Sequence, residues 1–274
     1  MMSEPVKIPV KNILSFEVED TFHIDSPDFE LDNTKSRIIP NLIHLLEMLD
    51  NHKARATFFV LGWVATRFPE IISLLDSRGH EVACHGYSHS DITTMEPDKF
   101  QNEIRRSREL LDEILDKPVL GFKGSANLYV KEHFDLLDEI SKNGFVYDCS
   151  TQPGGLAGKS SPWFDLRFPD GRVIRMVLQT TYRKWGIHLR YGEKLRLYPL
   201  WVTLRAIDEA NRRGHPAMIN MKLWELDKYQ NRAANSDYLQ YRRYGNLNLA
   251  EEKLGRLLDH FEFIPCAEAL GLEY

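Results

Sequence analysis

Residues 55–90 read RATFFVLGWVATRFPEIISLLDSRGHEVACHGYSHS. The stretch begins with a β-branched and aromatic run at residues 55–61, which is typical of a buried strand. A helix is predicted to begin at Pro69 and to end before Gly79, because proline suits the first turn of a helix and glycine its C-terminal cap. Glu81–Cys84 follows as a second strand. The order of strand, helix and strand predicts one βαβ unit.

The same alternation continues on both sides of this unit. Upstream, residues 12–19 are predicted to form a strand, and apolar residues then recur at helical spacing from Ile38 to Leu49. Downstream, helices are predicted at 97–115 and 131–142, and strands at 119–124 and 145–149. Strands that alternate with helices of this length indicate a parallel β/α architecture.

The second half of the chain interrupts the alternation once. Residues 151–162 are rich in Gly, Ser and Pro and predict a loop, and the turn sequence PDG within 165–181 predicts a β-hairpin. The remaining predicted elements are a helix at 193–213, a strand at 217–222, a helix at 249–261 and a short strand at 263–265. About seven strands in β/α order with an inserted hairpin predict a distorted (β/α) barrel. We expect one domain over residues 1–274, with its core at about 12–265.

The composition excludes some classes of protein and indicates a compartment. The net charge is −5, from 35 Lys and Arg against 40 Asp and Glu, which does not favour a nucleic-acid partner. Three cysteines, Cys84, Cys149 and Cys266, form no CxxC motif and leave at least one thiol unpaired, as expected in a reducing compartment. Residues 1–11 contain no apolar core of a signal peptide, and no apolar run is long enough for a transmembrane helix. We therefore expect a cytoplasmic protein; the sequence does not predict its oligomeric state.

An acidic cluster follows the first predicted strand. Glu17, Glu19 and Asp20 lie within four residues, and strand alternation places Glu17 and Glu19 on one face with Asp20 at the turn beyond. Carboxylates packed together need a cation or hydrogen-bond donors between them. The alternative interpretation is a solvated strand end.

Two histidines follow the strand Glu81–Cys84. His85 and His89 are four residues apart and converge on one point if the segment forms a helical turn, as in zinc ligand pairs. Such a pair also arises by chance in a sequence with 10 histidines. Two histidines and one carboxylate of the acidic cluster give three ligands and an open position for water, which is the arrangement of a catalytic metal site.

A third polar cluster, Lys222 with Trp224 and Glu225, follows the predicted strand 217–222. The lysine is a candidate electrostatic stabiliser or proton donor, and the alternative is a surface lysine with an extended stem. Residues 229–244 are rich in Tyr and Arg and are predicted to form a loop over the barrel mouth. Within them, Arg232, Arg242 and Arg243 are candidate contacts for a phosphate or pyrophosphate, although a solvated loop also explains them.

The order of these motifs resembles the polysaccharide deacetylase family, also described as NodB-homology or carbohydrate esterase 4-like. The motifs are SFEVEDTFH, the stretch at 55–90, GFKGS, FVYDCS and WELD. The chain looks most similar to the exopolysaccharide-associated branch with the motifs DVEDxF and HPWE. The resemblance implies a distorted (β/α)7 barrel and removal of an N-acetyl group from an amino sugar. It implies a divalent metal ion, zinc or alternatively Co, Ni or Fe, bound by His85, His89 and either Glu19 or Asp20.

Three positions depart from the family pattern. Glu17 stands where the family has its aspartate base, and Lys123-Gly124-Ser125 replaces the RAP triplet whose arginine orients that base. Lys222 replaces the histidine that acts as general acid. Each replacement keeps the sign of the charge, which favours altered chemistry over loss of function, with Glu17 as base, Lys123 as its orienting cation, and Lys222 as acid or oxyanion stabiliser.

Two functions are therefore predicted. The first is a metal-dependent hydrolase that removes an N-acetyl group from an amino sugar of a polysaccharide, or of its lipid- or nucleotide-linked precursor. The second is a catalytically inactive relative that binds a saccharide or a partner enzyme. The candidate sugar contacts are aromatic, although such residues more often pack in a core. They are Tyr87, Trp163, Tyr182, Trp185 and Trp224.

Overall fold

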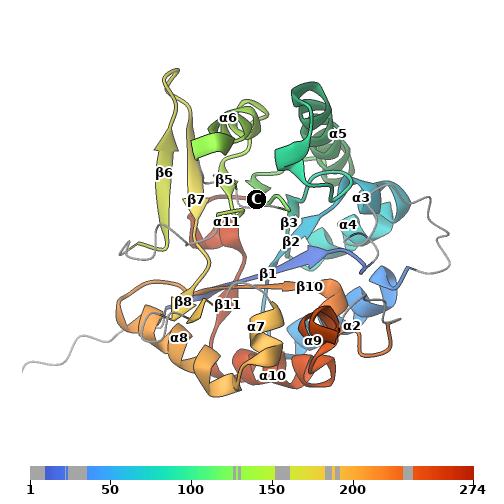
Figure 1. Ribbon diagram of the computed structural model, residues 1–274, viewed down its shortest axis with the longest axis vertical. Helices are drawn as coiled ribbons and strands as arrows, with labels where there is room; N and C mark the ends of the chain where they lie inside the picture. The colour runs from blue at the N-terminus through green and yellow to red at the C-terminus, as the bar shows by residue number, and fades with distance from the viewer. Residues whose placement is uncertain are drawn as a thin grey trace, which may run out of the picture.

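A computed structural model describes residues 10–21, 23, 36–125, 128, 131–151, 161–182, 187–188, 192–230 and 237–274. One curled sheet forms its centre, with helices around its outside (Figure 1). The strand order is β10-β1-β2-β3-β4-β5-β7-β6. These strands span Met218–Lys222, Asn12–Val18, Thr57–Val60, Glu81–Cys84, Gly121–Phe122, Tyr147–Asp148, Val173–Val177 and Trp163–Arg167.

All neighbouring strands in this order are parallel except the β6–β7 hairpin, so that seven strands of this order run parallel, and β11 adds an eighth among the described residues. β11 (Phe263–Ile264) pairs with the first residues of β1. The backbone N–H of Thr180, just beyond β7, donates to Met218 O of β10, which brings the two ends of the curled sheet together. The predicted distorted (β/α) barrel with an inserted hairpin is confirmed.

The alternation of β1 determines which side chains reach the interior. Leu14, Phe16 and Val18 pack against the helices in the large outer core, whereas Ile13 belongs to the smaller inner core. Successive side chains of a strand point to opposite faces. Glu17 therefore lies on the same face as Ile13, inside the curl of the sheet.

Ten α-helices are present in the described residues. They span Ile38–Asn51 (α2), Gly62–Arg67 (α3), Pro69–Ser77 (α4), Pro97–Leu115 (α5), Phe134–Lys142 (α6), Gly192–Leu197 (α7), Leu200–Arg212 (α8), Asp237–Tyr244 (α9), Leu247–His260 (α10) and Cys266–Ala269 (α11). Short 3₁₀ helices span Ile92–Thr94 (η2), Lys131–His133 (η3) and Leu223–Leu226 (η5). Cys266 and Ala267 of α11 lie in the inner core. A separate pair of strands, Thr181–Tyr182 (β8) and Ile187–His188 (β9), is antiparallel.

Several local predictions differ from the structure. The single helix predicted at 193–213 is wrong. Two helices, α7 and α8, occupy this range, and Pro199 is the N-cap residue of the second. A proline ring removes a backbone donor and does not fit inside a helix. Part of the loop predicted at 229–244 is the helix α9. Most of the loop predicted at 151–162 lies outside the described residues.

None of the described helices is long and apolar enough to cross a membrane.

Candidate metal and catalytic site

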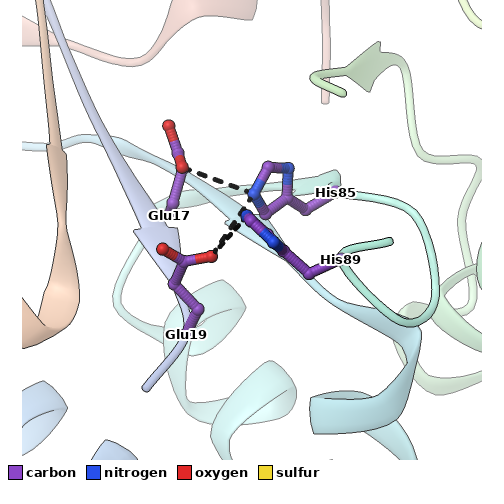
Figure 2. Close-up of side chains that lie close together, drawn as sticks. All are labelled: Glu17, Glu19, His85 and His89. Carbon is purple, nitrogen blue, oxygen red and sulfur yellow. Dashed lines mark ion pairs between the residues drawn. The ribbon is translucent and has the colours of Figure 1, made fainter. Parts of the chain in front are cut away.

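The strand ends of β1 and β3 bring four side chains of the predicted site together. Glu17 is on β1, Glu19 follows it, and His85 and His89 lie on the loop after β3 (Figure 2). One ligand atom from each residue lies within 4.8 Å of the others. Glu17, Glu19 and His85 are buried. Because carboxyl ends of parallel strands meet at one edge of a sheet, residues about 70 positions apart form one cluster.

The cluster has one close contact and two longer ones. Glu19 Oε2 lies 2.8 Å from His89 Nε2 and 3.8 Å from His85 Nε2. Glu17 Oε2 lies 3.4 Å from His85 Nε2. The two imidazole rings are inclined by 73° with centroids 5.2 Å apart. Both histidines therefore present Nε2 to the carboxylates.

The histidine loop reaches this geometry without a helical turn, so that local prediction was wrong. Gly86 and His89 both have positive φ, at 79° and 62°. A non-glycine residue in this left-handed region is uncommon and is found at functional sites. Glu103 of α5 fixes the loop by accepting the backbone N–H groups of Tyr87 (3.2 Å) and Ser88 (3.1 Å).

His85 is oriented by the neighbouring strand. Its Nδ1 lies 2.5 Å from the carbonyl oxygen of Lys123, at the end of β4. A histidine that donates from Nδ1 to a carbonyl is the tautomer that leaves Nε2 unprotonated for a metal ion. Burial lowers the pKa of His85 and keeps the ring neutral, as a ligand must be.

Asp20 does not join the cluster. Its carboxylate accepts hydrogen bonds from Ser36 Oγ (2.7 Å) and from the backbone N–H of Arg37 (3.2 Å), just before α2. Burial raises the pKa of Asp20 to about 6. Of the two carboxylates that the sequence left open as ligands, the geometry favours Glu19.

Three donors surround Glu17. Lys222 Nζ at the end of β10 lies 2.8 Å from Oε2, and Lys123 Nζ at the end of β4 lies 3.4 Å from Oε1. The third donor, Asn220 Nδ2, lies 2.6 Å from Oε1. The sequence reasoning missed Asn220, although its position two residues before Lys222 places both on the inner face of β10.

Lys222 also contacts Glu19 Oε1, at 2.5 Å. Burial alone raises the pKa of both glutamates, but the lysine and histidine charges outweigh it and hold these pKa values well below their ordinary range. Burial lowers the pKa of Lys222, whereas the two carboxylates raise it above its ordinary value. The cluster therefore holds ionised carboxylates beside a cationic lysine.

Lys123 is supported by β5. It is 3% exposed, and Asp148 is completely buried nearby at the end of that strand. Asp148 accepts hydrogen bonds from Ser150 N (2.9 Å) and Oγ (2.6 Å), and Ser150 Oγ accepts the backbone N–H of Gly124 (2.7 Å). Burial raises the pKa of Asp148 to about 6. This network holds the Lys123-Gly124 segment in place.

The aromatic candidates separate into different environments. Trp224 is buried, lines the cavity and donates from Nε1 to Glu19 Oε1 (3.2 Å). Tyr87 is not among the residues that line the cavity, and its ring stacks under Arg106 of α5 with 4.0 Å between the guanidinium carbon and the ring centroid. Trp163 packs against the inner core. Trp185, Arg232 and the Tyr182 side chain lie outside the described residues.

A cavity of about 300 Å³ opens beside the cluster. Its lining includes Glu17, Lys123, Lys222 and Trp224, together with charged residues of α7, η5 and α9. These last residues are Glu193, Arg196, Glu225, Arg242 and Arg243. Of them, Glu225, Arg242 and Arg243 were candidates from the sequence. Glu193 and Arg196 were missed, because neither belongs to a recognisable sequence motif.

The donor set fits a divalent metal ion. Two imidazole nitrogens and a carboxylate oxygen suit Zn²⁺ and related first-row ions. Within the described residues, the buried atoms Glu19 Oε2 and His85 Nε2 make no regular hydrogen bond. Buried polar atoms without such partners are rare in folded proteins, and a metal ion at this point satisfies both.

Two segments of the chain match known protein families or domains. Residues 38–146 match the family described as polysaccharide deacetylase. This part of the chain, less than half of its length, is thus similar to the polysaccharide deacetylase family. Residues 162–271 match a domain of unknown function, DUF3473. The deacetylase segment contains His85, His89 and Lys123, the second segment contains Lys222 and the α7 and α9 residues, and Glu17 and Glu19 precede both.

Curated relatives and solved structures show the same similarity. A peptidoglycan-N-acetylglucosamine deacetylase of Bacillus cereus is 34% identical over 98 residues, which cover 36% of this chain and 32% of that protein. A chitooligosaccharide deacetylase of Bradyrhizobium sp. is 38% identical over 60 residues, covering 22% and 27%. The chain thus spans about a third or less of these relatives. A structure described as a polysaccharide deacetylase from Mycobacterium smegmatis aligns with TM-score 0.63 and 17% identity over 95% of this chain and 88% of that one, which shows a shared fold.

Proposed function

We propose that the protein is a metal-dependent hydrolase that removes the N-acetyl group from an amino sugar of a polysaccharide, or of its lipid- or nucleotide-linked precursor. The observation that carries this proposal is the convergence of Glu19, His85 and His89 beside Glu17. The deacetylase family of residues 38–146 and the saccharide substrates named for its relatives support it.

Glu19 Oε2, His85 Nε2 and His89 Nε2 are the proposed ligands of a divalent ion, with zinc as our first choice and Co, Ni or Fe as the alternatives. Such an ion, when bound, lowers the pKa of a water molecule and polarises the amide carbonyl. Three protein ligands leave room for both water and substrate, as in catalytic sites.

Glu17 is the proposed general base. Its carboxylate lies beside the ligand cluster, 3.4 Å from His85 Nε2, and is held by Asn220 and the two lysines. It accepts the proton of the attacking water while the oxygen of that water adds to the amide carbon. Glutamate is one methylene longer than the family's aspartate, so its fixed position depends on these three donors.

Lys222 completes the proposed reaction. Its ammonium group lies 2.8 Å from Glu17 Oε2, the oxygen that faces His85, and the residue lines the cavity. It stabilises the negative charge that develops on the carbonyl oxygen. The C–N bond then breaks, the proton held by Glu17 or Lys222 passes to the sugar nitrogen, and acetate leaves. Lys123, fixed near Glu17, orients the base as the family's arginine does.

The remaining expectations are proposals from the sequence. We propose one catalytic domain, because β1 lies in one sheet between β2 of the deacetylase segment and β10 of the second segment. We also propose a cytoplasmic protein of exopolysaccharide synthesis, which favours a lipid- or nucleotide-linked substrate over a finished wall polymer.

Metal analysis combined with acetate release tests the proposal. Purified full-length protein is expected to hold one divalent ion per chain and to release acetate from chitooligosaccharides, UDP-N-acetylglucosamine or a polyprenyl-linked N-acetylated sugar. Acetate is measured by a coupled enzymatic assay before and after chelation. Protein that binds no divalent ion, or whose acetate release survives complete chelation, contradicts the proposal.

One observation favours a second function. The carboxylates of Glu17 and Glu19 face the ammonium groups of Lys123 and Lys222. These charges balance without a metal ion, as they would in a protein that only binds a saccharide or a partner enzyme. Metal-loaded protein that binds these saccharides and releases no acetate from any of them supports this alternative.

A further inference from the structure

We propose that the cavity wall built by α7 and α9 is a subsite for an anionic group, a carboxylate or a phosphate, of the N-acetylated saccharide. This inference rests on the proposed function and adds the class of substrate. Deacetylation itself requires only an N-acetyl group near Glu19, His85 and His89. The charged residues of α7 and α9 that line the cavity are not needed for that reaction and can contact another part of the substrate.

The cavity is locally cationic in an acidic protein. Five cationic side chains line it against three carboxylates, and Glu19, which contacts Lys222, adds a fourth, so that one positive charge is in excess, whereas the whole chain has a net charge of −5. The cations are Lys123, Arg196, Lys222, Arg242 and Arg243. A concave site with one excess sign of charge concentrates ligands of the opposite charge. A neutral oligosaccharide gains nothing from this excess.

The arginines of α9 are held in position over the cavity. Arg242 makes a two-pronged ion pair with Glu193 of α7, through Nε–Oε1 (3.0 Å) and Nη2–Oε2 (2.9 Å). Arg243 is the next residue and also lines the cavity. Planar guanidinium groups bind carboxylates and phosphates through two parallel hydrogen bonds. Glu193 fixes the guanidinium of Arg242, and Arg243 lines the same cavity, so two guanidinium groups border the space proposed for an oxyanion.

A buried ion pair fixes the end of α9. Arg196 of α7 is completely buried, and its Nε lies 3.0 Å from Glu225 Oε1. Its other nitrogens donate to the carbonyl oxygens of Arg242 (3.1 Å) and Gly245 (2.5 Å). Burying such a pair requires a large desolvation free energy. The pair joins η5, which follows Lys222, to the helix that carries Arg242 and Arg243.

Two glycines allow this close packing. A Cβ atom at Gly192 would lie 2.0 Å from Glu225 Oε2, and one at Gly245 would lie 3.0 Å from Leu197 Cδ2 of α7. Both contacts are shorter than ordinary van der Waals distance, so a side chain at either position would displace its neighbour. The wall is therefore a rigidly built surface rather than a solvated loop.

Two exposed tyrosines lie on α9, and one of them, Tyr238, has its ring centroid 5.7 Å from the guanidinium carbon of Arg242. Tyr238 and Tyr241 are 67% and 58% exposed on α9, where a spacing of three residues places them on neighbouring positions of one face. Aromatic rings exposed beside a saccharide site offer stacking surfaces for sugar rings. Arginines with adjacent tyrosines fit an acidic saccharide better than a free inorganic anion.

Binding of three N-acetylated probes to the full-length, metal-loaded protein tests the inference by isothermal titration calorimetry. The probes are chitotetraose, which is neutral, a hyaluronan tetrasaccharide, which carries carboxylates, and UDP-N-acetylglucosamine, which carries phosphates. The variants are Arg243→Ala, Arg243→Lys and Arg242→Gln. Arg205→Ala changes an exposed arginine of α8 and serves as the matched control.

We expect at least one anionic probe to bind about 10-fold or more tightly than chitotetraose, with the difference reduced by salt. The probe that does so identifies the carboxylate or the phosphate as the ligand. Arg243→Ala and Arg242→Gln reduce the ratio of the affinity for the anionic probe to the affinity for chitotetraose toward one. Arg243→Lys reduces this ratio partly, and Arg205→Ala leaves it unchanged.

Equal affinities for neutral and anionic probes overturn the inference, as does an unchanged ratio in the arginine variants or the absence of binding by every probe. Acetate release is measured on the same samples to separate the two proposals. If the protein prefers an anionic probe but releases acetate from none of them, the proposed hydrolase is contradicted and the proposed subsite is supported. Acetate release without anionic preference contradicts the subsite and leaves the hydrolase.

Discussion

Lys222 and Glu17 are register partners on the parallel strands β10 and β1, and their side chains meet with Nζ 2.8 Å from Oε2. The strands adjoin in space although the residues are 205 positions apart. The same ammonium group reaches Glu19, which lies beyond the end of β1. One lysine thus connects the proposed base to the proposed metal ligand.

Replacement of Lys222 tests its proposed catalytic role. Lys222→His is expected to lower kcat/KM for deacetylation about 10²-fold or more, because the oxyanion loses its fixed cationic partner. Bound metal per chain stays near its original value, since the three proposed ligands are unchanged. Lys99→Met on α5, an exposed lysine, is the control. Increased activity of Lys222→His would instead show that the lysine has no catalytic role and that the site lost activity when the family's general-acid histidine was replaced.

The sequence leaves Glu19 and Asp20 as alternative metal ligands, and substitutions at the two positions are expected to affect metal binding differently. Glu19→Gln is expected to abolish bound zinc, because its carboxylate lies 2.8 Å from His89 Nε2. Asp20→Asn is expected to retain it, because Asp20 accepts hydrogen bonds from Ser36 and Arg37 instead. Metal per chain is measured by plasma mass spectrometry after dialysis. Loss of zinc from Asp20→Asn in a correctly folded protein would contradict this ligand set.

Much of the fold was predictable because its signals are local. The helix Pro97–Leu115 begins and ends at the predicted residues, and β1 ends one residue before the predicted limit. The break at Pro199 was missed because the apolar residues of α7 and α8 keep one helical period across it. Tertiary packing, rather than periodicity, decides such cases.

The site was predictable in its members and not in its geometry. Strand alternation correctly placed Glu17 and Glu19 together. The loop of His85 and His89 was not predictable, because Glu103 on α5 sets its path through contacts 15 and 16 residues away. The Arg196–Glu225 pair joins residues 29 positions apart without any local motif.

Substitutions of Glu17, unlike those of the proposed ligand Glu19, are expected to affect catalysis and not metal binding. Glu17→Gln lowers deacetylation about 10²- to 10⁴-fold, the range for a lost general base, and keeps the bound metal. Glu17→Asp restores the family's residue and retains more activity than Glu17→Gln. Acetate release and metal content are measured on the same preparation. If Glu17→Gln also loses its metal, Glu17 is a ligand rather than the base.

A buried histidine remote from the site is expected to make stability depend on pH. His80 is 1% exposed and packs against the ring of Phe58, and its Nδ1 accepts the backbone N–H of Ala56 (3.3 Å). Burial lowers the pKa of His80 from 6.5 to about 4. Between these values the unfolded chain binds the proton and the folded protein does not, so the free energy of unfolding rises with pH across this window.

The variant His80→Gln lacks this contribution. The difference in unfolding free energy between wild type and variant is expected to grow by about 3 kcal/mol from pH 4 to pH 6.5, at about 1.4 kcal/mol per pH unit. Carboxylates titrate in both proteins and cancel in this difference. Urea unfolding at several pH values measures it, with His260→Gln at an exposed position of α10 as the control. A difference that stays constant with pH would show that the folded protein protonates His80 as readily as the unfolded chain.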